Sequence, residues 1–86
     1  PMILHENEHP IDVGEVGITN LTPRQMDVVR SLVDGNSDKQ TGYLLSISRE
    51  TVRKHINNAC AKLELRNRTQ LIVAFAQWQV TEGKEQ

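Results

Sequence analysis

Residues able to recognise DNA bases cluster in one part of the sequence, between residues 49 and 63. Arg53, Lys54 and Asn57 fall within about one helical turn of each other, away from the apolar positions of this stretch. Arginine pairs bidentately with guanine in the major groove and asparagine pairs with adenine, so these side chains have the chemistry of direct base recognition. Acidic residues, which phosphates repel, are limited to Glu50 at its start. By themselves, charge and periodicity favour DNA binding no more than the alternative, in which the helix is only a packing unit of the fold.

The elements that would position these side chains are also visible in the sequence. Apolar residues recur at the helical period on the other side of the stretch, at Val52, Ile56, Ala59, Cys60 and Leu63. A short helix is expected over 38–45, and a tight turn over 45–48 follows it, so residues 38–57 have the pattern of a helix-turn-helix. Gly42 is expected where the two helices cross closely, because a residue without a side chain permits that approach.

Helix start and stop signals divide the chain into an all-α, four-helix domain. Residues suited to N-caps stand before each expected helix, namely Thr22, Ser37, Ser48 and Asn67. Gly35 is typical of the position just after a helix. The expected helices are 23–34, 38–45, 49–63 and 68–80, within a domain over 21–82.

Charge is distributed unevenly, although the net charge is only −1. Residues 49–68 hold six basic and two acidic side chains, whereas residues 1–20 hold four acidic side chains and no lysine or arginine. Residues 1–20 also lack periodicity, which favours an acidic, flexible N-terminal arm or linker. One hypothesis is that this arm lies against the basic helix and competes with phosphate; a linker and a partner-binding segment are the alternatives. We expect Met2, after Pro1, to be the natural first residue.

Several other classes of protein are disfavoured. No apolar run approaches a membrane span and no signal-peptide pattern opens the chain, so we expect a cytoplasmic protein, associated with the nucleoid when bound. His5 and His9 have a His-x3-His spacing without helical periodicity, and Cys60 belongs to the apolar side of its helix, so we expect no metal and no cofactor. No nucleophile, base and acid stand together, so an enzyme is not expected.

Local motifs give the chain a family resemblance. Leu21-Thr22-Pro23-Arg24-Gln25 resembles the Leu-Thr-Pro-Arg-Glu opening of LuxR-type (GerE-like) DNA-binding domains. Residues 35–45 resemble the family's scaffold helix, residues 47–63 its recognition-helix frame, and Asn67-Arg68-Thr69-Gln70-Leu71 the start of its fourth helix. The resemblance covers about residues 21–80 in one register without gaps.

The resemblance implies a set of DNA contacts for this chain. It implies a recognition helix over about 49–63 in the major groove of double-stranded DNA, with base contacts from Arg53, Lys54 and Asn57. It also implies phosphate contacts from Lys39, Ser48, Thr51, Asn67 and Arg68.

Three positions depart from the family pattern. Thr41 stands where an aliphatic residue is usual, Ser46 replaces a turn glycine, and Glu64 replaces the glycine that usually ends the recognition helix. A residue other than glycine costs on the order of 1 kcal/mol at positive φ, so these departures bear on stability and turn geometry.

The fourth expected helix is apolar on two sides. Leu71, Ile72, Phe75 and Trp78 cluster on one side and suffice to cover a core. A second stripe lies roughly opposite, made of Thr69, Val73, Ala76 and Val80. The second stripe predicts a homodimer through this helix, which would bind a pseudo-palindromic site.

Three functions compete. The first is a sequence-specific transcription regulator, either self-standing or the effector half of a larger one, with RNA polymerase or another LuxR-type regulator as a further partner. The second is an interaction module, for example an antiactivator that heterodimerises through the fourth helix and need not keep the face of Arg53, Lys54 and Asn57. The third, a hydrolase or metal protein, has little support in the sequence.

Overall fold

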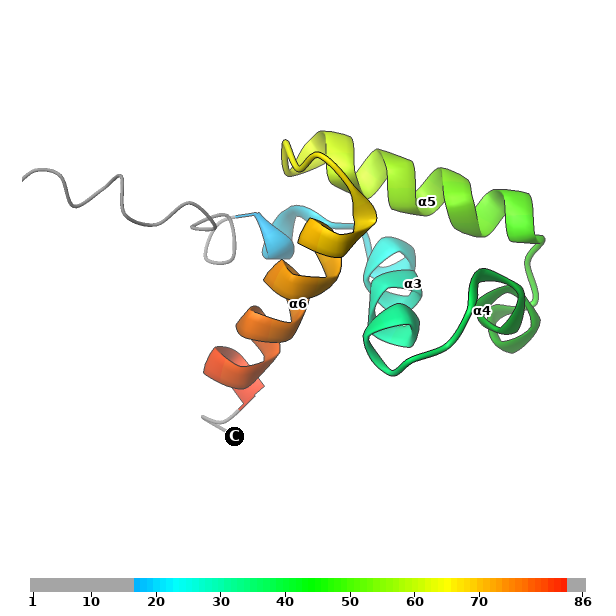
Figure 1. Ribbon diagram of the computed structural model, residues 1–86, viewed down its shortest axis with the longest axis horizontal. Coiled ribbons are helices and arrows are strands. Elements are labelled where there is room, and N and C mark those ends of the chain that lie inside the picture. The colour runs from blue at the N-terminus through cyan, green and yellow to red at the C-terminus, as the bar shows by residue number, and fades with distance from the viewer. Residues whose placement is uncertain (1–16, 84–86) are drawn as a thin grey trace, which may run out of the picture.

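The computed structural model describes residues 17–83, and this part of the chain is helical without strands (Figure 1). A 3-10 turn, η1 (Ile18–Asn20), is followed by four helices: α3 (Pro23–Val33), α4 (Asp38–Leu45), α5 (Arg49–Lys62) and α6 (Arg68–Gly83). The predicted all-α, four-helix class is confirmed. Helices α3 and α5 each end one residue before the predicted end, and α6 continues to Gly83 rather than ending at residue 80.

The first helix begins where its sequence signals predicted. The Thr22 hydroxyl accepts a hydrogen bond from the Gln25 backbone N–H at 3.0 Å, and the Gln25 side chain accepts one from the Thr22 N–H at 3.0 Å. Pro23 occupies the first turn, where no intrahelical donor is needed. This reciprocal capping box satisfies two backbone donors that the helix itself leaves unpaired.

The other helices are capped by the same chemistry. Ser37 and Gln40 form a second capping box at α4, and Ser48 accepts from the Thr51 N–H at α5. At α6 the Asn67 side chain accepts from the Gln70 N–H at 3.0 Å. Here the glutamine side chain accepts from the Arg66 N–H at 2.8 Å, one residue further back than in a capping box.

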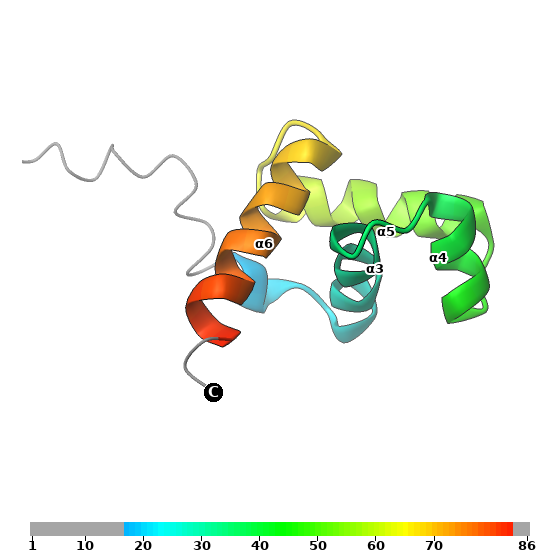
Figure 2. The ribbon, with the colours of Figure 1, turned by 60° about the horizontal axis from the view of Figure 1, so that its bottom comes forward.

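The core lies where α3, α5 and α6 meet, and α4 packs beside α5 and α3 (Figures 1 and 2). Its buried apolar residues come from every helix of that triad and from η1: Ile18, Leu21, Val28, Val29, Leu32, Val52, Ile56, Ala59, Leu63, Leu71, Ala74 and Phe75. Ile18 is fully buried, so η1 takes part in the core. The Lys62 ammonium donates to the Asn20 carbonyl at 3.2 Å and ties η1 to the end of α5.

Aromatic residues close the core on the side of α6. The ring centroids of Phe75 and Trp78 lie 5.4 Å apart, and the guanidinium carbon of Arg30 lies 5.6 Å from the Phe75 centroid. Phe75 is fully buried and Trp78 is half-buried against the core. This contact fixes the core side of α6 and leaves its other side exposed.

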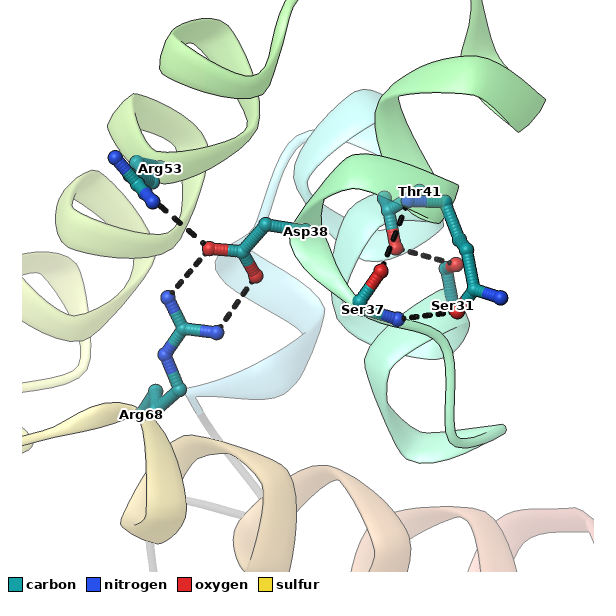
Figure 3. A network of polar contacts seen from close by, with 7 residues as sticks. Ser31, Ser37, Asp38, Thr41, Arg53 and Arg68 are labelled. Carbon is teal, nitrogen blue, oxygen red and sulfur yellow. Dashed lines mark hydrogen bonds and ion pairs between the residues drawn. The ribbon is translucent and has the colours of Figure 1, made fainter.

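Thr41, in a position where the family usually has an aliphatic residue, has a polar partner in the core. Its fully buried hydroxyl lies 2.7 Å from the hydroxyl of Ser31, across the contact between α4 and α3 (Figure 3). The Asn36 side-chain amide also donates to the Ser31 oxygen at 3.1 Å. Because a buried hydroxyl is costly only when it lacks a partner, Ser31 compensates for the departure at Thr41.

The turn of the helix-turn-helix depends on Gly42. A Cβ atom added there would lie 2.6 Å from the Ile47 carbonyl oxygen, closer than real Cβ atoms approach. The close neighbour is the turn and the start of α5 rather than a crossing helix, which corrects the sequence interpretation. Ser46 and Glu64 take positive φ values of 60° and 58°, as expected where the family has glycine, and Gly35 has a φ of 98°.

Candidate nucleic-acid interface

The side of α5 that faces away from the core is not covered by any described element. Helix α4 lies beside one end of α5 and α6 beside the other, while α3 lies beneath it (Figures 1 and 2). Lys54 and Asn57 are exposed on this outer side and make no side-chain hydrogen bond with any residue in 17–83. Their donors and acceptors are therefore directed to solvent and available to an external partner.

Arg53 lies at the edge of the outer side, because its side chain turns toward the start of α4. Its Nε atom is 3.4 Å from Oδ2 of Asp38, the first residue of α4 (Figure 3). The two terminal nitrogens of Arg68, the first residue of α6, donate to the same carboxylate at 2.7 and 2.9 Å. One carboxylate thus joins two of the predicted DNA-contacting residues, from two different helices.

The electrostatics of this group follow from its geometry. The hydrogen bonds from Arg68 hold the pKa of the Asp38 carboxyl below its usual value, against the opposing effect of burial. The hydrogen bond from Asp38 in turn raises the pKa of the Arg68 guanidinium. Asp38 is therefore ionised at neutral pH and Arg68 keeps its charge.

Sequence reasoning missed Asp38. The residue was visible only as the first residue of a capped helix, where an acidic side chain suits the helix dipole. Its partners lie 15 and 30 residues further along the chain, so no local spacing shows the pairs. The sequence held only one indication that Asp38 has a role: an acidic side chain stands next to Lys39, in a segment expected to bind phosphate.

The residues predicted to contact phosphate lie at the N-terminal ends of helices, where backbone N–H groups favour anions. Lys39 is exposed in the first turn of α4. The Ser48 hydroxyl accepts from the Thr51 N–H and donates to the Thr51 hydroxyl at 2.9 Å, so Thr51 is the better placed donor to an external group. Asn67 accepts through its oxygen at the α6 cap, and its amide N–H groups donate to no residue within 17–83. These roles stay predictions.

Two other basic residues have structural partners instead. Arg24 donates to the Leu45 carbonyl at 3.3 Å and so satisfies a carbonyl at the end of α4. Lys62 donates to Asn20 and to Gln25. The exposed basic residues at the starts of α4, α5 and α6 and on the outer side of α5 are Lys39, Arg49, Arg53, Lys54 and Arg68, and they define the candidate interface.

Burial raises the pKa of the Cys60 thiol, which packs half-buried against the core as expected. Within residues 17–83 no three His, Cys, Asp or Glu side chains are arranged to hold a metal ion. His5 and His9, the pair considered in the sequence, lie outside the described residues. No helix in the described part is long and apolar enough to cross a membrane.

Comparison with known proteins identifies the family to which this arrangement of helices belongs. Residues 19–75 match the family model described as bacterial regulatory proteins, luxR family. The chain belongs to this family. Its helix-turn-helix is α4, the turn over residues 46–48, and α5, in the DNA-binding domain of LuxR type.

Curated relatives of this LuxR-type domain are named as regulators. The chain is 42% identical over 57 residues, 66% of its length, to the nitrate/nitrite response regulator protein NarP of Escherichia coli (strain K12). It is 36% identical over 70 residues, 81% of its length, to the uncharacterized transcriptional regulatory protein YhcZ of Bacillus subtilis (strain 168). The chain spans 26% and 33% of the lengths of these two relatives. No solved structure gives a significant match.

Proposed function

We propose that this LuxR-type domain serves a transcription regulator that binds specific sites on double-stranded DNA with α5 in the major groove. The observation that carries the proposal is the uncovered outer side of α5, where Lys54 and Asn57 have no partner among the described residues. An asparagine left free at this place offers both the donor and the acceptor that adenine requires. Arg53, at the edge of the same side, adds a guanidinium suited to guanine.

Phosphate contacts would fix the orientation of α5 in the groove. Lys39, Thr51 and the amide of Asn67 lie at the starts of three helices, and Arg68 lies beside them. Contacts of this kind carry affinity without sequence information, whereas contacts from the outer side of α5 carry specificity.

Dimerisation through α6 is the second part of the proposal. Val73 and Val80 are 41% and 60% exposed, while Leu71 and Phe75 on the other side of the helix are fully buried. Thr69 is exposed and Ala76 half-buried on the same outer stripe, and all four side chains are small enough for close packing of two copies. A two-fold pair would place two α5 helices in successive major grooves, about 34 Å apart. The same stripe would also accept a different LuxR-type partner. In the alternative function, an antiactivator would form such a heterodimer through α6.

The proposal is tested by selecting bound duplexes from a random pool and then comparing variants on the selected and on a random duplex. Asn57→Ala removes the free amide from the outer side of α5 and should weaken the selected duplex by about 1–3 kcal/mol with little change on the random one. Lys39→Ala is the matched control for phosphate contact: it should weaken both duplexes alike and reduce the salt dependence by about one ion. Equal losses on both duplexes from Asn57→Ala would exclude α5 as the base-reading helix.

A further inference from the structure

An acidic residue lies inside the proposed DNA interface. Asp38 shares its carboxylate between Arg68, at 2.7 and 2.9 Å, and Arg53, at 3.4 Å, and only 12% of its side chain is exposed (Figure 3). Among the ion pairs within residues 17–83, these are the pairs that join different helices; those of Asp27 with Arg24 and Arg30 stay within α3. Asp38 is thus largely buried and joins three helices, so it differs from an acidic residue that only adds charge to the surface.

The carboxylate opposes binding to the DNA backbone. A carboxylate and a phosphate are both negative and repel each other. For any two like unit charges about 4 Å apart in water, the repulsion corresponds to about a fivefold loss of affinity. Asp38 also neutralises part of the charge that Arg53 and Arg68 would offer to phosphates anywhere on DNA. Because backbone contacts are the same for every sequence, this cost falls on all duplexes, specific or not.

The same carboxylate leaves the two terminal nitrogens of the Arg53 guanidinium available. Its contact uses the Nε donor and leaves the two terminal nitrogens unengaged by any described residue. A guanidinium fixed at Nε keeps a planar pair of N–H donors in one orientation, which is what bidentate recognition of the guanine O6 and N7 atoms requires. Arg68 is held on two of its five donors, so its remaining donors also point in a fixed direction.

We propose that Asp38 is a specificity-determining positioning residue, which orients Arg53 for guanine while it weakens binding to arbitrary DNA. The inference rests on the proposed function, because it needs α5 to read bases. It assigns to Asp38 no contact with DNA: the residue acts through Arg53 and through its charge.

The test compares Asp38→Asn with the unchanged chain on the selected duplex and on a random duplex, at about 50 mM and about 200 mM salt. At low salt the variant should bind the random duplex about fivefold more tightly, with the gain shrinking as salt rises. Binding to the selected duplex should not gain in parallel, so the ratio of the two affinities should fall at least about fivefold. Asp27→Asn is the matched control: it removes a carboxylate that is also paired with two arginines, but within α3, and should leave the ratio unchanged.

A double variant separates positioning from structural support. Arg53→Lys removes the Nε donor and the planar fork, so adding Asp38→Asn to it should no longer lower the specificity ratio. If Asp38→Asn lowers the ratio as much in the Arg53→Lys background as in the parent, or changes both duplexes by the same factor, the proposal is overturned. If the unchanged chain binds no duplex in preference to random DNA, the proposed function itself fails, which is a distinct result.

A measurement on the unchanged chain covers the case in which Asp38→Asn does not fold. The Nε–H of Arg53 should give a slowly exchanging side-chain NMR signal in the free protein that persists in the complex with the selected duplex. Loss of that protection on binding would show that Arg53 leaves Asp38 to contact DNA, and would overturn the positioning role.

Discussion

At the scale of single residues, the polar pair between α3 and α4 explains how a threonine fits a position suited to an aliphatic side chain. The Thr41 hydroxyl is fully buried and its partner is the Ser31 hydroxyl at 2.7 Å. No buried side-chain nitrogen or oxygen within the described residues lacks a partner. The two residues are therefore a matched set, and changing one should be worse than changing both.

Ser31→Ala should lower the free energy of unfolding by about 1–3 kcal/mol, because it removes the side-chain partner of the Thr41 hydroxyl. Ser31→Ala combined with Thr41→Val should recover most of that loss, since the pair is then replaced by apolar groups of similar shape. Urea denaturation followed by circular dichroism measures both. A double variant no more stable than the single one would mean that the hydroxyl pair does not compensate for Thr41.

At the scale of the elements, helix starts could be predicted because their signals are local. The capping residues lie within three residues of the groups they satisfy, so α3, α4 and α5 begin where the sequence indicated. The place of η1 could not be predicted, because Ile18 joins the core through tertiary packing and its neighbours in the sequence show no apolar periodicity. The exposed residues of the candidate site followed from the period of α5, whereas the Asp38 pairs arise only when α4, α5 and α6 are assembled.

The pair of Asp38 with Arg68 should also link α4 and α6 in a pH-dependent way. The pKa of the Asp38 carboxyl is lowered in the folded chain, so its contribution is complete above its unfolded value of about 4 and is lost as the pH falls through the lowered folded value. Asp38→Asn should therefore lower the free energy of unfolding by about 1 kcal/mol at pH 7, as partly exposed pairs do, and by less below pH ~4.

Urea denaturation across a pH series measures this difference. Arg68→Gln should show the same trend, and combining it with Asp38→Asn should add little, because the two changes remove one interaction. A difference between the unchanged chain and Asp38→Asn that is the same at about pH 3 and at pH 7 would contradict the linkage.

At the scale of the whole molecule, the two sides of α6 belong to different contacts. The side of Leu71, Ala74 and Phe75 completes the core of one copy. On the opposite side Thr69, Val73 and Val80 are exposed and Ala76 is half-buried, and this stripe is the surface proposed for the dimer. One short helix face gives a small interface, so the free dimer should be weak and strengthened by DNA.

Val73→Glu together with Ala76→Glu should shift the protein to monomer in sedimentation and abolish cooperative binding to a duplex with two half-sites. Like charges facing each other across a two-fold axis oppose the contact, while the helical content should stay unchanged. Thr81→Glu adds a charge of the same kind to an exposed position of α6 outside the stripe and serves as the control. Cooperative binding that survives in the Val73 and Ala76 variant would place the interface elsewhere.

The packing of Trp78 gives this domain a built-in optical reporter. It is the only tryptophan in the chain, and it lies against Phe75 on the core side of α6, away from the proposed dimer stripe. Its emission should therefore shift to the red when α6 leaves the core on unfolding, yet stay nearly constant when two copies associate. In a weak dimer, light scattering or sedimentation responds to both unfolding and association. The Trp78 emission responds to unfolding alone, so the two processes can be followed separately in one unlabelled sample.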